Sequence, residues 1–331
     1  MDSSVGSMES GKAVRWEVCE EADRVYNLTL GDCREVMKNI PDSSVDLVLT
    51  DPPYFRVKGE AWDRQWDTKA QFLLWLESIS VEWYRILKPN GSLYCFASPY
   101  LSAYVEVLLG NRFNVLNNIR WDKTSERGCH GHSCKETLRR FFPAYESIIF
   151  CDKDEQQSLE PLRSHVVTEL RDAGISANDI NLATNSQMAN HYLNTSQWTF
   201  PTEEKYNQLK AYVNRNRVPG LREYLPRKYC DLKKEYEQLR RPFTVSSEVQ
   251  FTDTWHFKIV NNGPLRHPCE KPVEMLKYII NASTRKGAVV LDSFMGTGSV
   301  GVACAELGRA FIGIEQEPKY FERAHARIRQ Q

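Results

Sequence analysis

Asp51, Pro52, Pro53 and Tyr54 place a carboxylate, two rigid amides and an aromatic ring within four consecutive residues. This combination suits chemistry on an exocyclic base amine, which is a poor nucleophile because its lone pair is delocalised into the ring. Asp51 and the carbonyl of Pro52 could each accept one N–H and aim the lone pair at an electrophilic methyl group. The prolines fix that carbonyl, and Tyr54 could stack on a base taken out of a duplex. Taken alone, the segment is more often an Asp-Pro turn with a core tyrosine.

A glycine-rich turn over residues 292–298, near the other end of the chain, is the second candidate. Gly296, Gly298 and Gly301 match the dinucleotide fingerprint G-x-G-x-x-G, and Glu315 stands near the position of a ribose-binding acid. Only 30 residues follow Gly301, too few for the second half of a nicotinamide site unless the fold is permuted. A nucleoside such as S-adenosylmethionine fits better, with both ribose hydroxyls on Glu315 and the methionine part along the turn. A tight packing turn with an exposed acid is the alternative.

Both groups directly follow short apolar runs of strand type, which places them at the carboxyl edge of a sheet, where open α/β sheets bind ligands. This position and the pairing of the two groups favour the chemical interpretation of Asp51. From Tyr26 onward, strand and helix patterns alternate, which predicts an α/β fold. The predicted strands are 27–30, 45–50, 92–97, 113–121, 145–151, 288–291 and 311–315. The predicted helices are 33–39, 69–87, 100–109, 273–282, 299–307 and 319–328. The sheet is therefore expected to be built from both ends of the chain.

Residues 152–255 interrupt this alternation with a polar, helix-patterned stretch, which predicts an inserted domain. The catalytic domain would then comprise residues 25–151 and 256–331. Within the insertion, the stretch 210–241 carries ten basic and four acidic side chains interleaved with four tyrosines. Such a stripe suits phosphate contacts, but a solvated helix with internal ion pairs fits equally well. We expect residues 1–24 to be disordered or a remnant of expression.

Residues 176–194 within the insertion read as two short helices about Thr184 and Asn185. The inward positions would be Ile180, Met188 and Tyr192. The pattern weakly resembles a repressor-type helix-turn-helix, in which Gln187, Asn190 and His191 would face the major groove. An ordinary helical hairpin is the equally weighted alternative.

Composition narrows the class of protein without deciding it. The formal net charge of the 331 residues is zero, so affinity for a polyanion must come from a local patch. The nine scattered cysteines form no disulfide-type framework, which predicts a reduced, cytoplasmic chain, and no stretch approaches the roughly 20 apolar residues of a membrane span. Cys129, His130, His132 and Cys134 crowd one loop, but their spacing fits no standard zinc pairing, and no metal is expected.

The chain resembles the β-class amino-methyltransferases of DNA, in which D-P-P-Y precedes F-x-G-x-G and a target-recognition domain lies between them. The resemblance spans Tyr26 to the end and also includes Gly31-Asp32 and the stretches 85–93, 267–272 and 311–315. It implies a Rossmann-like S-adenosylmethionine-dependent methyltransferase sheet in permuted order, with an inserted, mainly helical target-recognition domain. The loops 54–58 and 240–243 look most like those of prophage-encoded adenine methyltransferases of relaxed specificity.

The resemblance and the residue chemistry together give a set of expected site residues. The expected catalytic residues are Asp51, Pro52, Pro53 and Tyr54. The expected cofactor-binding residues are Asp32, Lys271, Pro272, Asp292, Phe294, Gly296, Gly298 and Glu315. The expected DNA-binding residues are Gln187, Asn190, His191, Arg240 and Arg241. By carry-over, Lys271 and Pro272 would border the methionine tail of the cofactor, and Asp32 would lie near its adenine.

The activity implied is methyl transfer from S-adenosyl-L-methionine to N6 of an adenine flipped out of double-stranded DNA. Aspartate at position 51, where cytosine-N4 enzymes more often carry serine, favours adenine. The enzyme would work in the cytoplasm of a bacterial or phage-infected cell, at the nucleoid, and the oligomeric state is not indicated. The alternatives are cytosine N4 or an RNA base, a non-enzymatic DNA-binding protein on the same scaffold, and an NAD-dependent oxidoreductase.

Overall fold

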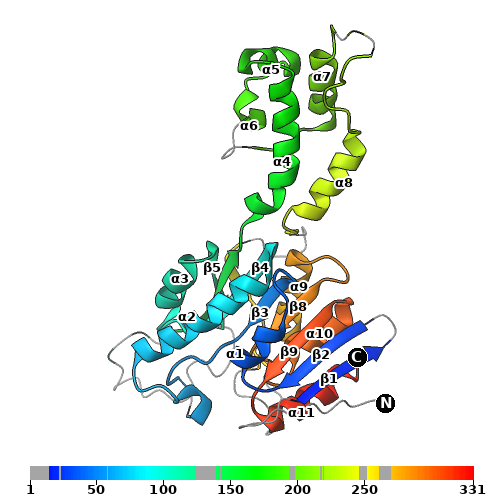
Figure 1. Ribbon diagram of the computed structural model, residues 1–331. Helices are drawn as coiled ribbons and strands as arrows, with labels where there is room; N and C mark the ends of the chain where they lie inside the picture. Colours follow the sequence, from blue (N-terminus) through cyan, green and yellow to red (C-terminus); the bar gives the residue numbers. More distant parts are fainter. Residues whose placement is uncertain are drawn as a thin grey trace. The chain divides into compact units, whose positions relative to one another are not determined.

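Figure 1 shows the computed structural model of the chain, in which two compact units can be distinguished. The structure describes residues 15–21, 24–57, 59–123, 139, 141, 143–193, 198–216, 218, 220–245, 252–260 and 270–331. The sheet unit comprises the described residues up to Asp154 and those from Arg241 onward, and the helical unit is Glu155–Arg240.

The described part of the sheet unit contains one nine-stranded sheet with the strand order β1-β2-β9-β8-β3-β4-β6-β5-β7. Its strands are β1 (Arg15–Glu21), β2 (Arg24–Leu30), β3 (Val45–Thr50), β4 (Leu87–Ala97), β5 (Asn114–Asp122), β6 (Tyr145–Asp152), β7 (Thr254–His256), β8 (Val289–Asp292) and β9 (Ala310–Glu315). The five strands from β2 to β4 in this order pair in parallel, whereas β6 is antiparallel to both β4 and β5. Strands β9 and β8 from the C-terminal part of the chain thus lie between β2 and β3 from the N-terminal part, which confirms the predicted α/β sheet.

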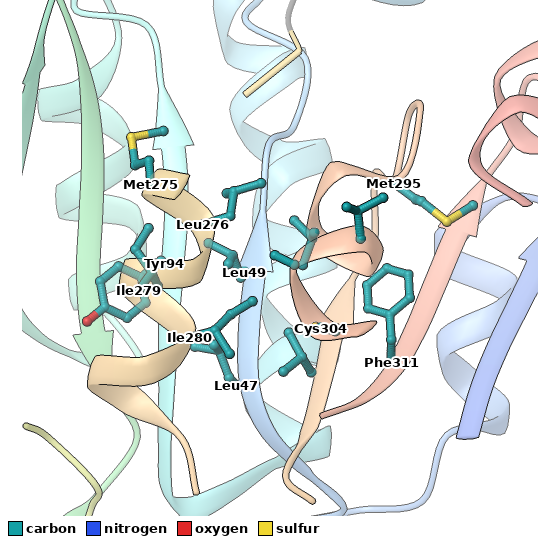
Figure 2. Packing of buried hydrophobic residues seen from close by; sticks show 14 of the residues in the cluster. Leu47, Leu49, Tyr94, Met275, Leu276, Ile279, Ile280, Met295, Cys304 and Phe311 are labelled. Atoms are coloured by element: carbon teal, nitrogen blue, oxygen red, sulfur yellow. The ribbon is translucent and has the colours of Figure 1, made fainter. Parts of the chain in front are cut away.

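Helices cover both faces of this sheet. One face packs against α1 (Cys33–Val36), α2 (Lys69–Ile86) and α3 (Ser102–Gly110), and the other against α9 (Val273–Ser283), α10 (Ser299–Leu307) and α11 (Pro318–Ile328). Because side chains alternate along a strand, Leu47 and Leu49 of β3 belong to the cluster under α9 and α10, while Val48 belongs to the opposite cluster. Figure 2 shows α9 directing its apolar side chains onto Leu47 and Leu49. Burial on both faces explains the nearly continuous apolar run of this strand.

Two segments differ from the sequence prediction. Residues 15–21, expected to be disordered, form β1, which pairs antiparallel with β2 from Arg15 opposite Leu30 onward. The apolar residues at positions 16 and 18 alternate with charged ones, a strand pattern hidden by the high charge of the segment. Residues 1–14 lie outside the described residues. The other difference concerns the end of the insertion, which was predicted at residue 255. The helical unit already ends at Arg240, and the strand Thr254–His256 pairs in parallel with β5 of the sheet unit.

The helical unit has a core of its own. Its helices are α4 (Glu155–Asp172), α5 (Ala177–Thr184), α6 (Ala189–Leu193), α7 (Glu203–Val213) and α8 (Tyr229–Leu239). Buried leucines of α4, α7 and α8 belong to one hydrophobic cluster together with Tyr206. Glu169 of α4 is buried but satisfied, since it accepts a hydrogen bond from Leu225 N at 2.9 Å and pairs with Arg222 at 2.7 Å. Across the described parts of both units, no helix combines the length and apolar character needed to cross a membrane.

Candidate functional site

The carboxyl ends of β3 and β8 meet at one edge of the sheet. The two strands pair in parallel, with Leu47 opposite Val290 and Val48 opposite Leu291. Beyond the paired residues, Thr50 Oγ1 donates a hydrogen bond to Asp292 Oδ1 at 2.9 Å and lies 3.1 Å from Ser293 Oγ. The Asp51 tetrapeptide and the glycine turn therefore start side by side, although more than 200 residues separate them in sequence.

One pocket is lined by both segments. Its lining includes Thr50, Asp51, Pro52, Pro53 and Tyr54 from the first and Asp292, Ser293, Phe294, Met295, Gly296 and Thr297 from the second. Gly31, Cys33, Trp62, Asp63, Glu270, Lys271, Glu315, Glu317 and Tyr320 also contribute. A shared pocket is a condition for the expected methyl transfer, because a methyl group can be transferred only between groups in contact.

Asp51 is held by a lysine. Lys271 Nζ donates a hydrogen bond to Asp51 Oδ2 at 2.5 Å. The other oxygen, Oδ1, is shielded from solvent and has no hydrogen-bond partner among the described residues. Burial raises the pKa of Asp51; the ammonium group of Lys271 opposes this shift, and the carboxylate of Glu146 adds to it. Asp51 thus presents one engaged oxygen and one free acceptor.

Glu146, at the start of β6, ties this lysine to the tetrapeptide. Its Oε2 lies 3.4 Å from Lys271 Nζ and accepts a hydrogen bond from the Tyr54 hydroxyl at 3.2 Å. Lys123 pairs with the other oxygen of Glu146. Burial alone would raise the pKa of Glu146, but Lys271 and Lys123 outweigh it and lower the pKa to about 2. Glu146 is therefore ionised near neutral pH.

The backbone after Pro53 is fixed by a buried aspartate. Asp63 Oδ1 accepts a hydrogen bond from Tyr54 N at 2.7 Å, and Asp63 O accepts one from Arg56 N at 2.8 Å. Phe55 and Arg56 have φ values of 57° and 61°, in the left-handed region that disfavours residues with a side chain. Backbone strain of this kind persists only where surrounding contacts impose it, and here Asp63 supplies two of them.

The glycine turn is closed by Glu315, at the end of β9. Its Oε2 accepts a hydrogen bond from Gly296 N and its Oε1 accepts one from Glu317 N, both at 2.8 Å. Gly296 has a φ of 54°, which favours glycine. Burial raises the pKa of Glu315, and it raises the pKa of Asp292 to about 7. Each oxygen of Glu315 still has a lone pair for a ligand hydroxyl.

Three of the expected cofactor residues do not line the pocket. Asp32 caps α1 and pairs with Arg34 at 2.6 Å, although its neighbours Gly31 and Cys33 do contribute to the lining. Pro272 precedes the first residue of α9 and is buried. Gly298 has a φ of 79°, and a Cβ there would meet Ala324 Cβ at 2.8 Å, so this glycine permits α10 to pack on α11.

The expected DNA-contacting residues lie in different surroundings. Gln187 and Asn190 are exposed on the helical unit, and His191 is half-buried. Met188, expected to point inward, is 41 % exposed because it precedes α6, whereas Ile180 and Tyr192 are buried as expected. Arg240 pairs with Glu237 at 2.5 Å.

Arg241 belongs to the sheet unit. Its side chain is 13 % exposed, lies 3.4 Å from Asp152 Oδ2, and has its guanidinium 5.4 Å from the ring centres of Phe150 and Phe243. Within the helical unit, Lys210, Arg222, Arg227 and Lys233 of the basic stretch also form ion pairs with acidic neighbours. For residues 210–241, these pairs favour a solvated surface with internal ion pairs over a stripe of basic side chains that contacts phosphates.

Trp62 lines the pocket, whereas Trp66, in the same polar loop, is buried against Phe72 and Trp75. The loop with Cys129, His130, His132 and Cys134 lies outside the described residues, as do Lys58 and residues 267–269 of the motif before α9. Among the residues that the structure does describe, no three His, Cys, Asp or Glu side chains are grouped so that they could hold a metal ion.

Two residues of the site were not expected from the sequence. Glu146 is the one carboxylate in the run Tyr145–Cys151 that forms most of β6, and a lone charge in a buried strand is a usable signal. Asp63 lies in a polar loop where acidic residues are common, so nothing in its pattern marked it.

Comparisons with known proteins show which proteins the chain is similar to. The sequence model of the family described as DNA methylase (N6_N4_Mtase) matches residues 45–326. The chain is 26 % identical over 329 residues to the type II methyltransferase M.HinfI of Haemophilus influenzae, covering 93 % of this chain and 69 % of that protein. It is 22 % identical over 322 residues to the type II methyltransferase M2.MboI of Moraxella bovis, covering 92 % and 87 %. The solved PvuII DNA methyltransferase, described as cytosine-N4-specific, shares its fold at a TM-score of 0.54 and 13 % identity, covering 91 % and 86 %.

Proposed function

The chain belongs to the N6/N4 DNA methylase family, and from this premise we propose that it transfers a methyl group to N6 of adenine in DNA. S-adenosylmethionine is the cofactor of such an enzyme and, when bound, supplies an electrophilic methyl group on a sulfonium. The observation that carries the proposal is the single pocket shared by Asp51, Tyr54 and the glycine turn.

The charge of the pocket fits this cofactor. Its charged lining consists of Asp51, Asp63, Glu270, Asp292, Glu315 and Glu317 against Lys271 alone among the described residues. Burial raises the pKa values of Asp51, Asp292 and Glu315, and at Asp51 the ammonium group of Lys271 opposes this shift. A ligand with a sulfonium and an ammonium group would supply the missing positive charge. The glycine turn, which has no side chain at Gly296, leaves room for such a ligand to approach the backbone.

The tetrapeptide can prepare the amine. Asp51 Oδ1 is an unsatisfied acceptor, so it can take one amine hydrogen, and the carbonyl of Pro52 can take the second. These two hydrogen bonds draw the nitrogen toward tetrahedral geometry and localise its lone pair. The N–C bond would form as the C–S bond of the cofactor breaks, with the thioether as leaving group, and the methylated nitrogen would then release one proton to solvent. Tyr54 lines the same pocket and offers a ring face to the base.

The choice of adenine rests on Asp51, since the family includes enzymes for both bases and the fold alone does not separate them. Incubating DNA with the protein and S-adenosylmethionine labelled with CD3, followed by nucleoside mass spectrometry, tests the choice. N6-trideuteromethyladenine is expected. Label found only in N4-methylcytosine would overturn the adenine assignment while leaving the amino-methyltransferase assignment intact.

We assign DNA recognition to the helical unit, in which the exposed Gln187 and Asn190 are the candidates for base contacts. The same proposal includes relaxed sequence specificity, which the loop resemblance to prophage enzymes implies. It also includes action on nucleoid DNA in the cytoplasm. A non-enzymatic DNA-binding protein would bind DNA but transfer no label. An NAD-dependent oxidoreductase would bind NADH rather than S-adenosylmethionine, and isothermal titration separates these two ligands.

A further inference from the structure

Three charged side chains distant in the sequence, Lys271, Glu146 and Lys123, form one network with Asp51 and Tyr54. Lys271 Nζ lies 2.5 Å from Asp51 Oδ2 and 3.4 Å from Glu146 Oε2, and the Tyr54 hydroxyl donates to the same Glu146 oxygen at 3.2 Å. Lys123 neutralises the second oxygen of Glu146. The Lys271 side chain is only 6 % exposed, so its ammonium group has few positions open to it besides the one between the two carboxylates.

We propose that Lys271, held by Glu146, is a positioning residue that fixes the carboxylate of Asp51. The hydrogen bond to Oδ2 prevents the carboxylate from turning, so Oδ1 is left as the acceptor for the amine. This role departs from the sequence expectation that Lys271 borders the methionine tail of the cofactor. The inference rests on the proposed methyl transfer and deepens it, since it says what makes Asp51 competent.

The cluster predicts opposite effects for two substitutions. The titratable groups that face Asp51 are Lys271, Glu146, Tyr54, Asp292 and Cys95. Burial raises the pKa of Asp51, Lys271 lowers it and Glu146 raises it. Lys271→Met therefore raises the pKa of Asp51, whereas Glu146→Gln lowers it, because a negative charge is lost and Lys271 pairs with Asp51 alone. General damage to the site would not shift the two variants in opposite directions.

The first measurement is kcat/KM for DNA between pH 5 and 9 at saturating S-adenosylmethionine, so that the effect of Asp292 on cofactor affinity does not contribute to the profile. Activity rises as Asp51 ionises, so the acidic limb of the profile reports its pKa. In Lys271→Met we expect this limb to shift to higher pH by about one unit or more. At a pH on the limb, kcat/KM then falls roughly tenfold. In Glu146→Gln the limb shifts to lower pH, and Lys271→Arg, which keeps the charge, restores it toward the wild-type position. Lys277→Met, which removes a lysine paired with Glu306 at 2.8 Å outside the pocket, leaves the profile unchanged.

The second measurement needs no turnover. A carboxyl group whose pKa is raised in the folded state destabilises the fold as pH increases toward that pKa. Between pH 5 and 8, Tm should therefore fall more in Lys271→Met than in the wild type, because the pKa of Asp51 is higher in this variant. In Glu146→Gln, Tm should fall less than in the wild type. The Kd for S-adenosylmethionine should change less than about threefold in Lys271→Met, a change of under 1 kcal/mol. A loss of affinity above about tenfold with an unmoved acidic limb would place Lys271 at the cofactor and overturn the inference. Limbs that move in the same direction would also overturn it. An inactive wild type would instead refute the proposed function.

Discussion

The carboxylate of Asp51 and the ammonium group of Lys271 lie 220 positions apart in the chain, and their side chains meet at 2.5 Å. The contact is possible because β3 and β8 are parallel neighbours, so that the loop before α9 and the end of β3 reach the same sheet edge. The D-P-P-Y tetrapeptide, the glycine turn and this lysine therefore form one site. Several consequences for binding, stability and catalysis can be measured.

Binding of S-adenosylmethionine should release protons near neutral pH. Burial raises the pKa of Asp292 to about 7, so this group is partly protonated in the free protein at pH 6.5. A cationic ligand favours its ionised form and lowers the pKa, so the affinity rises as pH increases from about 5 to about 7. Isothermal titration in buffers of different ionisation enthalpy measures the protons released.

The matched variants for this experiment are Asp292→Asn and Glu274→Gln. The amide introduced by Asp292→Asn would keep an oxygen acceptor for Thr50 and Phe294 N, so the turn remains while the titration is removed. We expect reduced proton release in Asp292→Asn and wild-type release in Glu274→Gln, whose carboxylate is 75 % exposed on α9. Equal release in all three proteins would exclude Asp292 as the source.

Glu315→Ala should weaken binding of S-adenosylmethionine and also loosen the turn. Glu315 accepts backbone hydrogen bonds from Gly296 and Glu317, and hydrogen bonds to a charged group contribute roughly 1.5–3 kcal/mol each. Loss of one such contact to the ligand lowers the affinity roughly 10- to 150-fold. The affinity of Glu315→Gln, which keeps one acceptor oxygen, should lie between those of the wild type and Glu315→Ala. Unchanged affinity in Glu315→Ala would show that the ligand binds elsewhere.

Gly298→Ala should destabilise the fold without removing any lining residue of the pocket. The added Cβ would lie 2.8 Å from Ala324 Cβ and 3.0 Å from Ala324 Cα, at a φ of 79°. Left-handed strain and overpacking together cost about 2–4 kcal/mol. Gly59→Ala is the control, because no neighbouring atom lies within 4 Å of its added Cβ. Urea unfolding followed by circular dichroism measures both, and similar midpoints would contradict the packing role of Gly298.

Arg240 and Arg241 should differ in their effect on DNA binding. Arg241 lies against Asp152, Phe150 and Phe243, so Arg241→Ala should lower the Tm and leave the salt dependence of DNA affinity unchanged. Arg240 is 40 % exposed, and if it contacts a phosphate, Arg240→Ala should reduce the slope of log K against log salt by about 1. Equal reductions in both variants would mean that Arg241 leaves its partners to bind DNA.

The sequence was most informative where a single physical rule governs position. Strands buried on both faces appear as short apolar runs, so Val45–Thr50 was predicted with its observed bounds. The rule that ligands bind at strand ends located the pocket. The helix Ser299–Leu307 was likewise predicted correctly, because it follows directly from the glycine turn.

The sequence was less informative where side chains from distant segments meet. The partner of Lys271 depends on how far a flexible four-carbon chain reaches, and no periodicity encodes that distance. Glu146 faces Lys271 only because β6 runs antiparallel to β4, a pairing not specified by the sequence pattern. Met188 was placed inward by helical spacing, but α6 begins at Ala189, so the spacing does not apply to it.

The most direct test of the account is methyl transfer by Asp51→Ala beside the wild type, measured as labelled N6-methyladenine in single-turnover reactions at saturating S-adenosylmethionine. Loss of the acceptor should lower the rate roughly 10²- to 10³-fold or more, while affinity for DNA and for S-adenosylmethionine is retained. Asp51→Asn, which keeps an acceptor oxygen but loses the charge that pairs with Lys271, should give an intermediate rate. A wild-type rate in Asp51→Ala would contradict the claim that this carboxylate prepares the amine for methylation.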